Sequence, residues 1–250
     1  MVRSRLTAHV IHLRRREDRK ERFLRWNAGH AVEWHWHDAV EAAAVDRQDG
    51  ELLSSPDLAV DDAVIATAMS HRRQWRQCVA DDAPRLIFED DACARHGFEP
   101  LLSRGLAGLS AADLIFFGCN TDAELMLELP DRLFSYVVFG NAAHASPGYF
   151  DAFAKTAPPC SPPILYQAYL TWGLLAYAVS PAGAAKLLRE CFPLRPVTVD
   201  LFQHGRKVES MAIDAMLNAA MQRGAVRALT CFPPLVIGPN ADSDLDARKG

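Results

Sequence analysis

Hydrophobic and polar residues alternate with two different periods along the first forty residues. Residues 8–13, AHVIHL, form a short apolar run that predicts a buried strand. Residues 16–30 contain good helix formers and end near Gly29, which predicts a helix with a glycine stop. In residues 31–40, AVEWHWHDAV, apolar and polar residues alternate with a period of two, which predicts a strand with one solvated face.

The same alternation of strands and helices continues along the chain. Asp61 and Asp62 are suited to cap a helix that extends to about Val79. Residues 84–88, PRLIF, predict a buried strand. The remaining patterns predict helices at 97–109, 182–191 and 210–222 and strands at 112–118, 173–180 and 226–232.

Two segments give a weaker pattern. Residues 130–165 are rich in Pro, Gly and aromatic residues, and we predict irregular structure there. The tail at 238–250 is polar, and we expect it to fray. Elsewhere, strands that alternate with helices predict an α/β domain with a mostly parallel central sheet flanked by helices.

Three acids, Glu89, Asp90 and Asp91, directly follow the predicted strand at 84–88. Sheets of this class bind ligands at the carboxyl ends of their strands. Alternate side chains at a strand end point the same way, so Glu89 and Asp91 are expected to share a face while Asp90 points elsewhere. Such a pair can hold Mg²⁺ or Mn²⁺ together with phosphate oxygens of a substrate. A solvated turn accounts for the same three acids, and on spacing alone it is the favoured interpretation, because runs of acids are common on protein surfaces.

A basic cluster follows the first strand. Arg14, Arg15 and Arg16 lie at the start of the predicted helix, where free N–H groups and arginine donors suit a diphosphate. A solvated helix with Glu–Arg pairs explains the same residues. His35 and His37 share one face of a strand and could ligate a metal, but a solvated face is favoured because no third ligand is apparent nearby.

Composition narrows the function classes. The net charge of −4 in 250 residues gives no global basic field for nucleic acid. Six scattered cysteines without a CxxC pair indicate reduced thiols and a cytoplasmic protein. No apolar run approaches the length of a membrane span, and the N-terminus is a poor signal peptide, so only peripheral membrane association stays open.

Eight short motifs occur in an order typical of one family. They are HVIHLRRREDRKERF, HDAV, IATAMSHRRQW, LIFEDDA, ADLIFFG, AYAVSPAGAAKLL, AIDAML and PPLV, and together they cover residues 8–237. The chain therefore resembles glycosyltransferase family 25, the lipopolysaccharide-type and collagen-type β-glycosyltransferases, as a divergent member. His12 and Arg14 stand where the family motif has Asn and Asp, and Glu41 also departs from its motif.

The resemblance implies a GT-A-like single domain at 1–237. Its nucleotide-sugar half would span about 1–120 and its acceptor half about 121–237. It also implies a UDP-sugar donor, most often with galactose or glucose, and Mn²⁺ or Mg²⁺. The expected acceptor is a glycan, a lipid-linked sugar or a peptide. Residues 144–170 are apolar and rich in proline, and they are the candidate acceptor loop.

The resemblance also implies roles for individual residues in an inverting transfer. Asp91, with Glu89, is the expected metal ligand. Asp214 is the first candidate for the general base and Asp122 the second; a helix-capping role is the alternative for Asp214. The residues expected to bind the donor are His12, Arg14, Arg15, Arg19, Ser70, His71, Glu89 and Asp90.

Two other functions remain open from the sequence. One is a module that binds nucleotide sugars without efficient turnover, because His12 and Arg14 depart from the family motif. The other is a metal-dependent phosphoester hydrolase that uses the same acids. That class commonly uses two metal ions and needs more ligands than the sequence gathers here.

Overall fold

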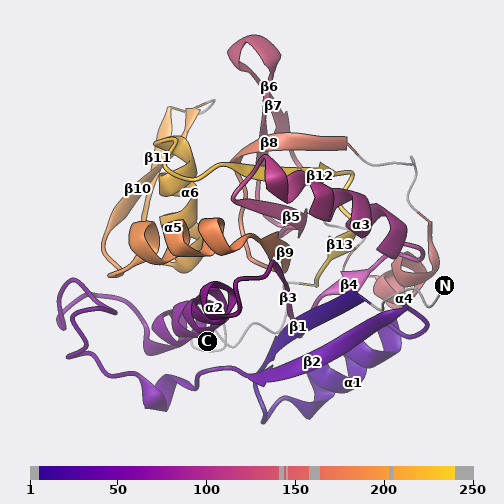
Figure 1. Ribbon diagram of the computed structural model, residues 1–250, viewed down its shortest axis with the longest axis horizontal. Coiled ribbons are helices and arrows are strands. Elements are labelled where there is room, and N and C mark those ends of the chain that lie inside the picture. Colours follow the sequence, from indigo (N-terminus) through magenta and orange to yellow (C-terminus); the bar gives the residue numbers. More distant parts are fainter. Residues whose placement is uncertain (1–5, 141–143, 145, 158–163, 203–204, 240–250) are drawn as a thin grey trace.

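The structure is a computed structural model that describes residues 6–140, 144, 146–157, 164–202 and 205–239. Within them, eleven strands form one sheet, whose main order is β2-β1-β3-β9-β5-β12-β8-β6-β7 (Figure 1). The strands of this sheet are β1 (Leu6–His12), β2 (Val32–Asp38), β3 (Arg85–Glu89), β4 (Cys93–Ala94), β5 (Leu114–Gly118), β6 (Leu125–Leu129), β7 (Leu133–Val137), β8 (Ile164–Leu170), β9 (Ala176–Val179), β12 (Ala228–Phe232) and β13 (Val236–Ile237). A separate hairpin consists of β10 (Val197–Leu201) and β11 (Arg206–Ser210).

The helices cover both faces of this sheet. They are α1 (Glu17–Trp26), α2 (Asp62–Asp81), α3 (Glu99–Ala107), α4 (Tyr149–Lys155), α5 (Pro181–Cys191) and α6 (Ile213–Gln222). The α/β class with flanking helices is therefore confirmed. The sheet, however, is mixed rather than mostly parallel. β1 runs parallel to β2 and β3. β9 lies between β3 and β5 and runs antiparallel to both of them.

The two faces of the sheet belong to two hydrophobic cores, as the period of two in each strand requires. In β5, Leu114 and Phe116 join the core beneath α2, α5 and α6. Ile115 and Phe117 of the same strand join the core beneath α1 and α3. The central strands are buried on both sides, and the site at their ends is therefore built on a rigid support.

Helix starts follow the sequence signals. Asp61 caps α2 by accepting a hydrogen bond from the backbone N–H of Ala63 at 2.8 Å. Ser180 caps α5 by accepting one from the N–H of Gly183 at 3.0 Å, and Pro181 occupies the first helical position. These predicted caps are confirmed.

The prediction of irregular structure at 130–165 is wrong in part. β7 and α4 lie in that segment, and β8 begins at its end. β6 and β7 form a hairpin that projects from the body of the molecule in Figure 1. Within the candidate acceptor loop at 144–170, residues 145 and 158–163 lie outside the described residues, as do residues 240–250 of the predicted tail.

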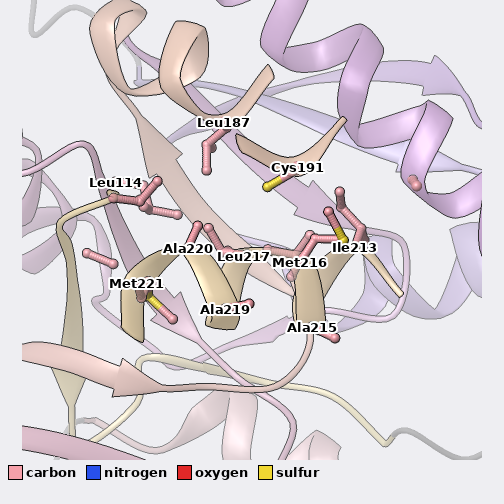
Figure 2. Packing of buried hydrophobic residues seen from close by; sticks show 14 of the residues in the cluster. Leu114, Leu187, Cys191, Ile213, Ala215, Met216, Leu217, Ala219, Ala220 and Met221 are labelled. Atoms are coloured by element: carbon pink, nitrogen blue, oxygen red, sulfur yellow. The ribbon is translucent and has the colours of Figure 1, made fainter. Parts of the chain in front are cut away.

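The C-terminal helix α6 is anchored by its apolar residues. Figure 2 shows Ile213, Met216 and Leu217 of α6 directed toward side chains of α5 and of the sheet, all of them in one buried cluster. The first turn of α6, which contains Asp214, is thereby fixed in position relative to β9 and α5.

The described cysteines are free and buried: Cys78, Cys93, Cys119, Cys191 and Cys231. None of the helices in the described ranges has both the length and the apolar character that crossing a bilayer requires.

Candidate functional site

A cavity of about 280 Å³ lies at the carboxyl ends of β1 and β3. It brings together residues that are far apart in the sequence and that the motifs had singled out. The predicted site residues on its lining are Arg15, Arg19, Ser70, His71, Glu89, Asp90, Asp91 and Asp214. His12, Arg14 and Asp122 are not among the described residues that line it.

Three helices begin at this cavity. Leu13 and Arg15, just before α1, form part of its wall. The first turn of α2 contributes Ala63 and Val64, and α6 contributes Asp214. Helix N-termini expose unpaired N–H groups and carry a partial positive charge. The cavity therefore favours an anionic ligand, although it contains carboxylates.

Asp90 is the buried member of the acidic triplet, with 4% of its surface exposed. Its carboxylate accepts a hydrogen bond from Arg19 Nη1 at 2.9 Å, and its other oxygen lies 2.9 Å from His12 Nδ1. The N–H of Leu13 also approaches that second oxygen at 3.4 Å. Asp90 thus ties the turn after β1 to the end of β3, and His12 acts beneath the cavity rather than on its wall.

Glu89 is held from below by a chain of buried polar side chains. His71 Nε2 lies 3.1 Å from Glu89 Oε1, and His71 Nδ1 lies 3.0 Å from the hydroxyl of Tyr177. Trp75 Nε1 donates a hydrogen bond to the same hydroxyl at 2.8 Å. His71, Trp75 and Tyr177 are almost completely buried, so this chain links the hydrophobic core to the cavity.

Asp91, unlike Glu89 and Asp90, has a buried carboxylate oxygen that no described side chain contacts by a hydrogen bond. Its Oδ1 is buried and has no hydrogen-bond partner among the residues that the structure describes. Burial, and next the negative charge of Glu89, raise the pKa of Asp91 from 3.8 to about 7. A carboxyl group with an unpaired oxygen beside a second carboxylate is stabilised by a cation placed between them.

This donor set fits a divalent cation that takes few protein ligands. In the described ranges, no three His, Cys, Asp or Glu side chains lie close enough together to hold a metal ion by themselves. Mg²⁺ and Mn²⁺ commonly use one or two carboxylates, with water and substrate phosphates as the other ligands. Glu89 and Asp91 fit that pattern, because Asp91 Oδ1 has no hydrogen-bond partner among the described residues.

Asp214 approaches the cavity from the first turn of α6. One of its oxygens accepts a hydrogen bond from the N–H of Gly173 at 3.1 Å, and the other accepts one from the N–H of Ala215 at 2.8 Å. Burial raises its pKa above 3.8, and the charge of Glu89 adds to the effect. Asp122 is exposed and does not reach the cavity lining.

Gly173 positions Asp214 and has no tolerance for a side chain. Its φ of +78° lies in the left-handed region, and a Cβ there would meet Asn120 Oδ1 at 2.2 Å. The N–H of Asn120 in turn donates to the carbonyl of Trp172 at 2.9 Å. Asn120 and Gly173 thus line the cavity beside Asp214, and the sequence patterns did not single them out.

The remaining predicted donor-binding residues have structural partners. Ser70 Oγ accepts a hydrogen bond from the N–H of Val40 at 2.9 Å and fastens the loop after β2 to α2. Arg14 forms an exposed ion pair with Asp38, outside the cavity. Arg15 lines the cavity and contacts Glu41 at 3.2 Å.

A second cavity of about 460 Å³ adjoins the first on the open face of β1 and β2. Here His9 Nδ1 lies 2.9 Å from His37 Nε2 and 3.0 Å from Arg85 Nη2. The sequence interpretation considered His35 and His37 without a third histidine nearby, and His9 supplies one. Burial and the charge of Arg85 lower the pKa of His9 from 6.5 to about 4, so the His9 ring is uncharged at pH 7.

Residues 6–203 match the family described as Glycosyltransferase family 25 (LPS biosynthesis protein). The chain belongs to glycosyltransferase family 25. The resemblance inferred from the ordered motifs is therefore confirmed, and the chain is a glycosyltransferase. The matched region contains the acidic triplet and the turn after β1 but ends before Asp214, so the assignment of Asp214 depends on its position in the cavity. A comparison with curated protein sequences gave no match.

Proposed function

We propose that this family 25 enzyme is a metal-dependent inverting glycosyltransferase. It transfers a hexose, galactose or glucose, from a UDP-sugar to a hydroxyl group of a glycan, lipid-linked or peptide acceptor. One observation carries the proposal: a single cavity combines the carboxylates Glu89 and Asp91, the arginines Arg15 and Arg19, and the separate carboxylate of Asp214.

The side of the cavity next to α1 and α2 is suited to bind the diphosphate of the donor. The N-terminal ends of α1 and α2 face it with their partial positive charge, and Arg15 and Arg19 line the same wall. Small side chains border this side: Ala39, Ala42, Ala63, Ala66 and Thr67. They leave room for the flat base and the ribose of a nucleotide.

The two carboxylates at the end of β3 are the proposed ligands of the metal ion. Glu89 and Asp91 would hold Mn²⁺ or Mg²⁺ against the phosphates, with water completing the coordination. When bound, the cation neutralises the negative charge that develops on the UDP leaving group. Asp90 does not join them, because its two oxygens are engaged by Arg19 and His12.

Asp214 supports the acid–base part of the reaction. An inverting transfer needs a base that removes the proton of the acceptor hydroxyl as the oxygen attacks the sugar. A base works best when its pKa lies near the working pH, and burial raises the pKa of Asp214 in that direction. The N–H groups of Gly173 and Ala215 each donate to one carboxylate oxygen of Asp214 and so fix the carboxylate in position beside the cavity.

No specific observation in the structure favours either alternative function, the nucleotide-sugar-binding module or the phosphoester hydrolase. The binding-module interpretation was based on His12 and Arg14, which support the cavity from below or lie outside it. A two-metal hydrolase would need further ligands beside Glu89 and Asp91, and no third ligand joins them in the described residues.

The donor and the metal are tested together by thermal shift. The protein is mixed with a panel of UDP-sugars and other nucleotide sugars, each with MnCl₂ or with EDTA. We expect stabilisation by UDP-galactose or UDP-glucose that requires Mn²⁺. Stabilisation by a purine nucleotide sugar alone, or equal stabilisation in EDTA, would contradict the proposal.

The base is tested by two matched substitutions. Asp214→Asn is expected to lower kcat by about 10²–10⁴ with little change in donor binding, because only the proton acceptor is lost. Asp122→Asn makes the same chemical change on an exposed residue and is expected to leave kcat near that of the parent. The opposite result would make Asp122 the base.

A further inference from the structure

Three buried side chains behind the acidic triplet form a directional hydrogen-bond chain. The donors and acceptors run from Trp75 through Tyr177 to His71, and the chain ends on Glu89 Oε1. Trp75 and Tyr177 are 0% exposed and His71 is 1% exposed, so no water competes for these groups. The chain connects α2 and β9 to the end of β3.

The direction of this chain follows from Trp75. The indole N–H can only donate, so the hydroxyl oxygen of Tyr177 is its acceptor, at 2.8 Å. The hydroxyl proton of Tyr177 then points to its other neighbour, His71 Nδ1, at 3.0 Å. Burial raises the pKa of Tyr177 well above its usual value, so the hydroxyl keeps this proton.

The tautomer of His71 is fixed as a result. Because Nδ1 acts as the acceptor of the Tyr177 hydroxyl proton, the ring proton of His71 is on Nε2. Nε2–H then donates to Glu89 Oε1 at 3.1 Å. The opposite tautomer would leave the Tyr177 hydroxyl proton without an acceptor and would direct a lone pair of His71 at the carboxylate.

We propose that Tyr177 is a positioning residue that acts through His71 to hold the Glu89 side chain in a fixed orientation in the cavity. Because His71 contacts Glu89 Oε1, the second carboxylate oxygen of Glu89 is the one left to bind a cation. Groups that orient metal ligands from behind typically change metal affinity or activity by about 10–100-fold when they are removed. This inference rests on the proposed function, because the affinity it predicts is that for the divalent cation.

The first test reads the tautomer in the unmodified, metal-free protein. Nitrogen-15 chemical shifts of the His71 ring distinguish a protonated Nε2 from a protonated Nδ1. We expect Nε2–H, and Nδ1–H would overturn the inference. This measurement needs neither a substitution nor catalytic activity.

The second test measures Mn²⁺ binding by calorimetry with UDP present. Tyr177→Phe removes one hydroxyl group, and we expect Mn²⁺ affinity to fall about 10–100-fold. The control Tyr166→Phe makes the same change on β8, outside the cavity lining, and is expected to leave the affinity unchanged. An unchanged affinity in Tyr177→Phe would overturn the inference.

A second pair of variants covers the case in which Tyr177→Phe does not fold. The amide group of His71→Gln can replace the Nε2–H donor, whereas His71→Leu cannot. We expect the Gln variant to retain clearly higher Mn²⁺ affinity than the Leu variant, and equal affinities would overturn the inference. If the unmodified protein binds no Mn²⁺, the proposed function fails, and the His71 tautomer alone decides the role of Tyr177.

Discussion

Replacing Asp91 with asparagine should stabilise the metal-free protein at alkaline pH. The pKa of Asp91 is raised from 3.8 to about 7 by burial and by the charge of Glu89. A group whose pKa is raised by folding contributes stability that is present below 3.8 and is lost as the pH rises to about 7. At pH 8 the parent therefore holds a buried, uncompensated carboxylate that Asp91→Asn removes.

The size of this effect follows from the two pKa values. They differ by about 3, and each pKa unit corresponds to about 1.36 kcal/mol, which bounds the effect at about 4 kcal/mol. Asp91 retains some exposure at the cavity wall. We therefore expect Asp91→Asn to be more stable than the parent by about 2–3 kcal/mol at pH 8, and by less than about 1 kcal/mol at pH 4.5.

Urea unfolding in EDTA at the two pH values measures the difference directly. Asp122→Asn is the control, because this exposed residue should change the free energy of unfolding by no more than about 0.5 kcal/mol. With saturating MnCl₂, the parent should gain stability and Asp91→Asn should not. The reasoning is refuted if Asp91→Asn is no more stable than the parent at pH 8, or if its advantage persists at pH 4.5.

Three further predictions concern the surroundings of the cavity. Asp90→Asn should lower the free energy of unfolding by about 3 kcal/mol, because it removes the buried negative charge that pairs with Arg19; urea unfolding at pH 7 measures this, and an unchanged free energy of unfolding would contradict a stabilising Arg19–Asp90 pair. His9, whose pKa is lowered to about 4, should make the parent lose stability as the pH falls from 6.5 to 4, by about 1–2 kcal/mol more than His9→Gln. If the free energies of unfolding of the parent and of His9→Gln changed equally with pH, this contribution of His9 would be excluded. Gly173→Ala should lower both kcat and thermal stability, the latter by about 1–3 kcal/mol, because of its positive φ and its contact with Asn120; an Ala variant with parent-like kinetics would show that this turn does not position the base.

The pH predictions for Asp91 and His9 have opposite signs over the same range. The Asp91 contribution falls as the pH rises from about 4 to 7, whereas the His9 contribution rises. The pH profile of the parent alone therefore combines the two effects. Only the difference between each variant and the parent isolates one group.

The sequence predicted most elements of the fold because their signals are local. The caps at Asp61 and Ser180, and the two-residue period of the first strands, depend on neighbouring residues only. The direction of β9 could not be predicted from neighbouring residues, because a buried antiparallel strand between parallel strands has the same apolar pattern as a parallel strand. β7 and α4 were missed because Pro, Gly and aromatic residues surround them.

The candidate site was predictable to the extent that its residues lie at strand and helix ends. The acids after β3 and Asp214 at the start of α6 are of this kind. Tyr177 and Gly173 are not: their roles depend on contacts with His71 and Asp214, which are distant in the sequence. A lone tyrosine in an otherwise aliphatic strand was the available signal for Tyr177.

The different roles of the adjacent acids likewise needed the structure. The sequence predicted that Asp90 would point away from Glu89 and Asp91. It could not show that Arg19 and His12 would both contact the Asp90 carboxylate. His9 was overlooked as a neighbour of His37 because the register of two parallel strands is set by tertiary packing.

The central claim is that Glu89 and Asp91 hold a divalent cation for a UDP-sugar. The most direct measurement is the release of UDP from UDP-galactose and UDP-glucose, with MnCl₂ or EDTA, by the parent and by Asp91→Asn. We predict UDP release by the parent with Mn²⁺, none above background in EDTA, and none by Asp91→Asn under either condition. Full release in EDTA, or by Asp91→Asn, would contradict the account.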